Sequence, residues 1–151
     1  MNTDEGRSPK SAFEKTNVQA QLTDKEAKVL TVARYYFMTF ANPSKQTWLN
    51  ANDYAIKHFS SSNGPYASLA VLSAVQTMRQ ARNSTFMFND ADCKACSNYL
   101  TRNELSFITA IRCKSKGNDN GAAGHAFILC EGNDTKEFLH AIEILSAVCF
   151  R

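Results

Sequence analysis

The chain has 151 residues, the length of one domain with one hydrophobic core, and its formal net charge of +3 is far below that of a dedicated nucleic-acid-binding protein. Ten phenylalanines and five tyrosines argue against a disordered chain, and the apolar runs are too short to cross a bilayer. These features predict a single globular domain without a membrane partner.

The number of cysteines indicates the cellular compartment. The five cysteines are an odd number in a chain longer than the usual disulfide-stapled domains. The N-terminus has no apolar stretch of the kind found in signal peptides. We therefore expect free thiols and a cytoplasmic protein.

The N-terminal part of the chain divides near residue 22. Residues 1–22 are polar and charged with almost no periodic apolar positions, so we expect a flexible tail, followed by a helical domain over residues 23–151. Thr23 and Glu26 form a capping-box pattern that predicts a helix start. That helix should end at Ala41, because the residue before Pro43 avoids the helical region.

Two further helices are expected before residue 83. A weaker amphipathic pattern predicts one over residues 48–59, and Pro65 suits the first turn of the next. This third helix should be the central one, since its alanines allow close packing. Its expected core positions are Leu69, Leu72, Val75 and Met78. Residues 83–92 read as an extended connector, because Thr85–Phe88 has strand propensity but no partner strand.

The C-terminal half begins with a second capping box, Thr101 and Glu104, which predicts a helix to about residue 116. Residues 117–121 have loop chemistry, and residues 122–130 should form a short buried helix. Asp134 and Glu137 predict a third capping box at the start of the last helix. Its apolar stripe comprises Phe138, Ala141, Ile142, Leu145, Val148 and Cys149.

Together these elements predict an all-α fold, a single-domain bundle-like packing of five or six helices with a flexible N-terminal tail. Short connections make neighbouring helices antiparallel, and the sequence shows no repeat of fixed period.

The C-x-x-C pair Cys93 and Cys96 has three interpretations. It could supply half of a structural zinc site, with His125 and Cys130 as the other ligands, although no second C-x-x-C or H-x-x-x-H is present. It could be a redox pair, which usually requires a βαβ setting. The third interpretation is two inert, half-buried thiols. We expect no cofactor, with structural zinc as the alternative.

Basic residues are concentrated between positions 79 and 116. Arg112, Lys114 and Lys116 could contact nucleic acid or an acidic partner. Their position at a helix C-terminus also suits the helix dipole alone. No recognition-helix pattern accompanies them.

No catalytic motif is present: the sequence lacks paired carboxylates, G-x-S-x-G, a Walker loop and G-x-G-x-x-G. An enzyme is therefore not the expected function. We expect a small helical regulatory or adaptor protein that binds another protein or itself, through aromatic residues such as Tyr35, Tyr36, Phe40 and Trp48. The alternatives are a DNA- or RNA-associated transcriptional regulator that uses residues 79–116, and a zinc-stabilised helical domain.

Overall fold

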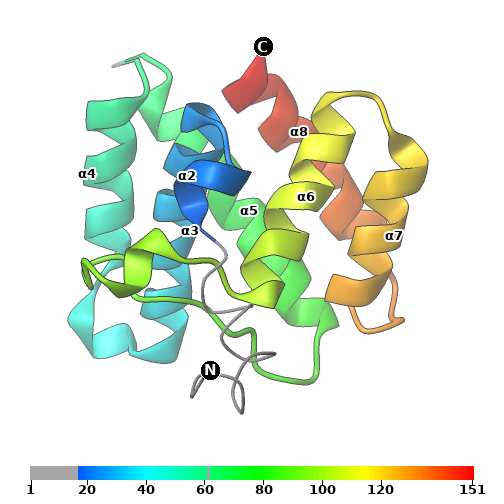
Figure 1. The fold of residues 1–151 in the computed structure, drawn as a ribbon, viewed down its shortest axis with the longest axis horizontal. Coiled ribbons are helices and arrows are strands. Elements are labelled where there is room, and N and C mark those ends of the chain that lie inside the picture. The colour runs from blue at the N-terminus through cyan, green and yellow to red at the C-terminus, as the bar shows by residue number, and fades with distance from the viewer. Residues whose placement is uncertain (1–16, 61) are drawn as a thin grey trace, which may run out of the picture.

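Helices make up the regular structure of the residues that the computed structural model describes, 17–60 and 62–151. The all-α prediction is confirmed, and Figure 1 shows the helices packed on one another. In chain order the described helices are α2 (Val18–Gln21), α3 (Asp24–Ala41), α4 (Trp48–His58), α5 (Gly64–Ala81), α6 (Arg102–Ser115), α7 (Asp119–Leu129) and α8 (Lys136–Phe150), with two 3₁₀ turns, η2 (Pro43–Lys45) and η3 (Cys96–Asn98).

The first described segment differs from the expected tail. Asn17 caps α2 by accepting the N–H of Gln19, and it pairs with Tyr99 in an isolated β-bridge. Leu22 is buried next to the N-cap residue Thr23, where an apolar side chain fixes the entry into a helix. The tail prediction is wrong for residues 17–22, because Leu22 draws this segment onto the core. Its remaining part, residues 1–16, lies outside the described residues.

The predicted helix starts have mixed outcomes. The capping boxes of Thr23 and Thr101 both form, with each threonine accepting an N–H and each glutamate accepting the N–H of its cap residue. Helix α7 starts earlier than expected, because the side chain of Asn118 caps it within the predicted loop. The third capping box is wrong: Thr135 is the N-cap of α8, and Asp134 instead accepts the N–H of Lys136 at 2.9 Å.

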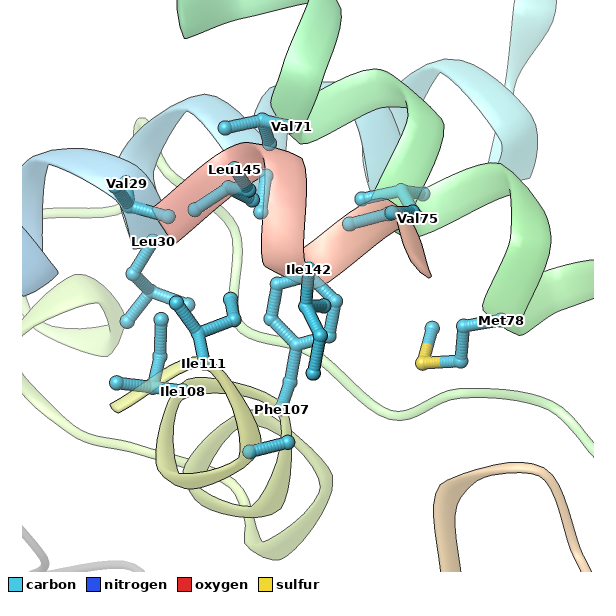
Figure 2. Close-up of a cluster of buried hydrophobic side chains, with 14 of the residues drawn as sticks. Val29, Leu30, Val71, Val75, Met78, Phe107, Ile108, Ile111, Ile142 and Leu145 are labelled. Atoms are coloured by element: carbon cyan, nitrogen blue, oxygen red, sulfur yellow. The ribbon is translucent and has the colours of Figure 1, made fainter. Parts of the chain in front are cut away.

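The hydrophobic core lies between α5, α6 and α8, with α3 closing one side. Figure 2 shows side chains of these four helices meeting there, among them Val29, Leu30, Val71, Val75, Phe107, Ile108, Ile111, Ile142 and Leu145. Of the predicted core positions of α5, Val75 and Met78 are buried and Leu72 is partly buried, but Leu69 is 61% exposed, so its prediction is wrong. Ala67, Val71 and Ala74 complete the buried face. Helix α5 packs against α8, and Leu69 lies on the exposed face of α5.

The fold repeats itself, which the sequence pattern did not predict. A long helix, a short helix and a long helix occur twice, as α3–α4–α5 and α6–α7–α8. The first helix packs on the second in each half, and α5 packs on α8 across the middle. Helices α3 and α6 share the pattern T-x-x-E-x4-T-x-x-R, and the apolar positions within it are buried alike. The matched pairs are Leu22 and Leu100, Thr23 and Thr101, Glu26 and Glu104, Val29 and Phe107, Leu30 and Ile108, Thr31 and Thr109, Ala33 and Ile111, and Arg34 and Arg112.

Candidate functional site: the disulfide loop and its buried anchor

Two of the four predicted zinc ligands are joined to each other in the structure. Cys93 and Cys96 form a disulfide, with their Cα atoms 5.2 Å apart. His125 and Cys130 instead belong to α7 and its C-cap, in the other half of the fold. Among residues 17–60 and 62–151, no three His, Cys, Asp or Glu side chains are arranged to hold a metal ion. The predicted zinc set is not assembled, and the expectation that all five cysteines are free thiols is wrong for this pair.

The loop that carries the disulfide, residues 89–101, is anchored by a buried ion pair. Arg34 of α3 binds Glu104 of α6 in a bidentate fashion, with Nε–Oε2 and Nη2–Oε1 distances of 2.7 and 2.9 Å. Both residues are almost completely buried, at 2% and 0% exposure. Glu104 also accepts the backbone N–H groups of Asn89 and Thr101, at 3.0 and 2.9 Å. A buried carboxylate with this many donors is fully satisfied.

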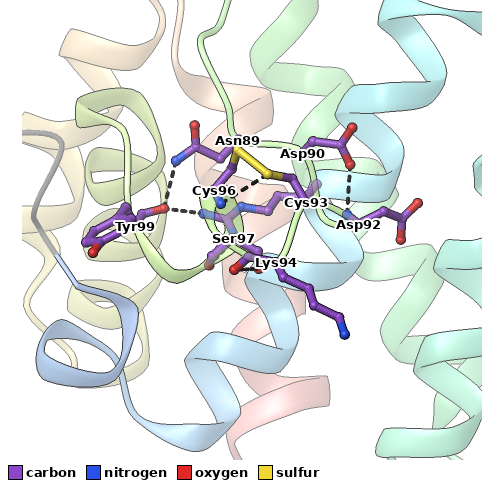
Figure 3. The surroundings of a disulfide bond; sticks show 9 residues. Asn89, Asp90, Asp92, Cys93, Lys94, Cys96, Ser97 and Tyr99 are labelled. Carbon is purple, nitrogen blue, oxygen red and sulfur yellow. Dashed lines mark hydrogen bonds between the residues drawn. A yellow bond between two sulfur atoms is a disulfide. The ribbon is translucent and has the colours of Figure 1, made fainter.

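Arg34 connects this pair directly to the loop. Its guanidinium donates to the carbonyl oxygens of Ser97 and Tyr99, at 2.8 and 2.7 Å. The neighbouring Tyr35 donates its hydroxyl to Asp92 at 2.7 Å. Burial, followed by this hydrogen bond, raises the pKa of Tyr35 to about 12. Figure 3 shows the loop lying over α3. The loop is therefore held to α3 independently of its disulfide.

The equivalent pair in the repeat holds a different segment. Arg112 of α6 binds Glu26 of α3 through two 2.8 Å bonds, and it donates to the carbonyl oxygen of Gln21 at 2.8 Å. Gln21 lies two residues before Thr23, as Tyr99 lies two residues before Thr101. Burial raises the pKa of Glu26, but hydrogen bonds from Arg112 and Thr23 outweigh it, so the net shift is downward.

The two disulfide-bonded cysteines differ in exposure. Cys96 is exposed, whereas Cys93 is half-buried and its Sγ accepts the backbone N–H of Cys96 at 3.1 Å. The ring that the disulfide closes spans only four residues. Loop-closure entropy then contributes about 2 kcal/mol, less than for the long loops that structural disulfides usually close. The bond is therefore a minor cross-link in a loop that is already anchored.

A pocket of about 530 Å³ opens beside Cys96. Its walls include the exposed side chains of Met87 and Tyr99, which are 62% and 37% exposed, and its base includes the buried Leu100. The backbone at Met87 is fixed from both sides, because its N–H donates to Asn103 and its carbonyl accepts from Thr101. The pocket thus combines exposed apolar side chains with a hydrogen-bonded backbone.

Three basic residues of the segment 79–116 are paired with carboxylates of the same chain. Arg112 is bound to Glu26, Lys114 lies 3.1 Å from Asp119, and Arg82 pairs with Glu131 at 3.7 Å. Lys116 is exposed at the C-cap of α6. Of the three predicted contact residues, two have their charge directed toward carboxylates of their own chain.

The three remaining cysteines are free thiols that are buried or half-buried. Cys130 and Cys149 are buried thiols, and burial raises the pKa of each, to about 12 for Cys149. Cys113 is half-buried.

The aromatic residues predicted to form a binding face differ in exposure. Tyr36 is buried with its hydroxyl 2.6 Å from Ser68, and the Phe40 ring is covered by the guanidinium of Arg79. Trp48 is 43% exposed.

The residues that organise this site, Arg34, Glu104, Met87 and Tyr99, were not among the predicted site residues. Glu104 was recognised only as a helix cap. The recurrence of T-x-x-E-x4-T-x-x-R could have identified the two arginines, because charged residues on an otherwise buried helix face need partners. Met87 and Tyr99 carry no comparable pattern.

Comparison with known proteins gives no relative: no family model matches the chain, and neither does a curated protein or a solved structure. The helices of the described residues include none with the length and apolar character needed to cross a membrane.

Proposed function

We propose that this chain is a small helical adaptor or regulatory protein that binds a short segment of another protein in the pocket beside the disulfide loop. The observation that carries the proposal is the exposed pair Met87 and Tyr99 on a backbone fixed by the Arg34–Glu104 ion pair. Methionine and aromatic residues are enriched at protein interfaces, and methionine adapts its shape to different partners.

The rigid base under the pocket supports the same proposal. Binding loops are most effective when the scaffold fixes them, because less conformational entropy is lost when a partner docks. Here the base is fixed by Glu104, which holds Asn89 and Thr101, and by Arg34, which holds Tyr99. Only the apolar side chains would need to adjust to a bound peptide.

We further propose that the protein works in the cytoplasm. Three cysteines are free, and a disulfide that closes a four-residue ring contributes little to stability. In reducing compartments such disulfides are usually transient and serve redox chemistry.

The test is a random-peptide display selection on the full chain. The expected result is an enriched set of peptides with a common apolar anchor, whose titration shifts backbone amide resonances in residues 87–103. Met87→Asp should weaken binding about tenfold or more, because it places a charge where the anchor is buried. Ile144→Asp is the matched control, since Ile144 is also exposed but lies on α8, outside the pocket lining.

Peptides that bind wild type and Met87→Asp equally well would contradict the proposal. Concentration-dependent dimerisation through the same residues, without peptide binding, would replace it with self-association.

A further inference from the structure

We propose that the Cys93–Cys96 disulfide is a thiol–disulfide exchange site, in which an incoming thiolate attacks the sulfur of Cys96 and Cys93 is the leaving thiolate. This chemistry needs no bound peptide, although Cys96 also lines the pocket of the proposed adaptor function.

Accessibility assigns the two roles. Cys96 is exposed at the start of η3, while Cys93 is half-buried. Figure 3 shows both cysteines in the loop. Exchange requires the attacking thiolate to reach one sulfur in line with the S–S bond, so its rate depends on access. Cys96 is therefore the favoured point of attack.

The leaving group has a stabilising donor in place. The backbone N–H of Cys96 already donates to Cys93 Sγ at 3.1 Å. A hydrogen bond of this kind favours the charged form of a sulfur over the neutral form. The same N–H would stabilise the negative charge that develops on Cys93 as the S–S bond breaks.

The loop is built to keep its shape when the bond is broken. Arg34 holds Ser97 and Tyr99, and Tyr35 holds Asp92, on either side of the disulfide. The N–H of Ser97 also donates to the carbonyl of Cys93 at 2.8 Å. The two sulfurs would thus stay close in the dithiol form, ready to be oxidised again.

The reductant is a thiol, such as glutathione or a protein dithiol, and it supplies the two electrons that reduce the disulfide. The first thiolate forms a bond to Cys96 Sγ, and the electron pair of the S–S bond passes to Cys93. A second thiolate then attacks the reagent's own sulfur in the mixed disulfide and releases Cys96. The products are the Cys93–Cys96 dithiol and one oxidised reagent disulfide, and the two protons of the reagent thiols end on the two cysteines.

The test uses the full chain carrying Cys113→Ser, which removes the half-buried free thiol. The protein is equilibrated with reduced and oxidised glutathione, quenched in acid and mapped by mass spectrometry. We expect reversible conversion of the pair between disulfide and dithiol, with unchanged far-ultraviolet circular dichroism. A short exposure should place the first glutathione on Cys96. Cys130 and Cys149 are internal controls, because both are buried and should stay unmodified.

The single variants Cys93→Ser and Cys96→Ser are controls. Neither can form the intrachain disulfide, so neither should show the reversible conversion between disulfide and dithiol. Melting curves of both variants check that they remain folded.

Two results would overturn the proposal. One is a pair that stays oxidised in excess reduced glutathione and dithiothreitol while the protein is folded. The other is a first adduct on Cys93 in the wild-type pair.

Discussion

The two glutamate–arginine pairs between α3 and α6 use the same sequence pattern but differ in depth. Arg34 and Glu104 are almost fully buried, whereas the side chain of Arg112 is 27% exposed and that of Glu26 6%. Glu104 accepts four hydrogen bonds and Glu26 three, the extra donor being the N–H of Asn89. The deeper pair holds the disulfide loop, and the shallower pair holds the N-terminal segment.

The same kind of glutamate–arginine pair therefore serves two purposes in this fold. The reciprocal arrangement makes α3 and α6 antiparallel, because each helix start binds an arginine of the other helix. Arg34 has two backbone carbonyl partners, Ser97 and Tyr99, whereas Arg112 has one, so the Arg34–Glu104 pair also shapes a surface loop. Breaking each pair separately should therefore affect different parts of the molecule.

The largest effect is expected from Glu104→Gln. It leaves Arg34 as an unpaired charge in the core, which costs about 3–5 kcal/mol of unfolding free energy. Urea unfolding measures this loss. The double variant Glu104→Gln with Arg34→Met should recover part of it, since no buried charge remains. A loss below about 1 kcal/mol in the single variant would contradict the burial of this pair.

A smaller effect is expected from Glu26→Gln. Arg112 can turn toward water when its partner is neutral, so the loss should be about 1–2 kcal/mol in the same urea experiment. An equal loss of unfolding free energy in Glu26→Gln and Glu104→Gln would contradict the proposed difference between the two pairs.

The pH dependence of the unfolding free energy tests the contribution of the ionised Glu26 carboxylate. Because its pKa is lower in the folded protein than the ordinary value of 4.5, the carboxylate adds stability above that value. This contribution is lost as the pH falls through the folded pKa. Unfolding free energies measured below pH 5 should therefore decline more steeply for wild type than for Glu26→Gln. Parallel curves would show that Glu26 is not the group responsible.

The smallest effects are expected at the two caps. Thr23→Ala and Thr101→Ala each remove a side-chain acceptor from a first-turn N–H, at a cost of about 1 kcal/mol. Thr101 also donates to the carbonyl of Met87, so its loss should be slightly larger and should loosen the pocket. Thermal melts compare the two variants. A difference of several kcal/mol would mean that the two helix starts are not equivalent.

Sequence reasoning was strongest where the structure is set locally. The caps at Thr23 and Thr101 depend on side chains three residues apart, and the stripe of α8 follows one helical period, so both could be predicted. Leu69 could not, because its exposure depends on how α5 packs against α8. The candidate site could be predicted only in part. The C-x-x-C spacing identified Cys93 and Cys96 as candidate residues, but their disulfide lies in a loop held by Arg34, which is far away in the sequence.

Hydrogen exchange in two matched variants tests the central claim most directly. Arg34→Lys and Arg112→Lys both keep a positive charge but lose the planar set of donors that binds a carboxylate and a carbonyl together. The Arg34 variant should speed exchange of the Ser97 and Tyr99 amides about tenfold, with little change at Gln21 and Leu22, and the Arg112 variant should do the reverse. Unchanged exchange at Ser97 and Tyr99 in Arg34→Lys would show that this arginine does not hold the disulfide loop.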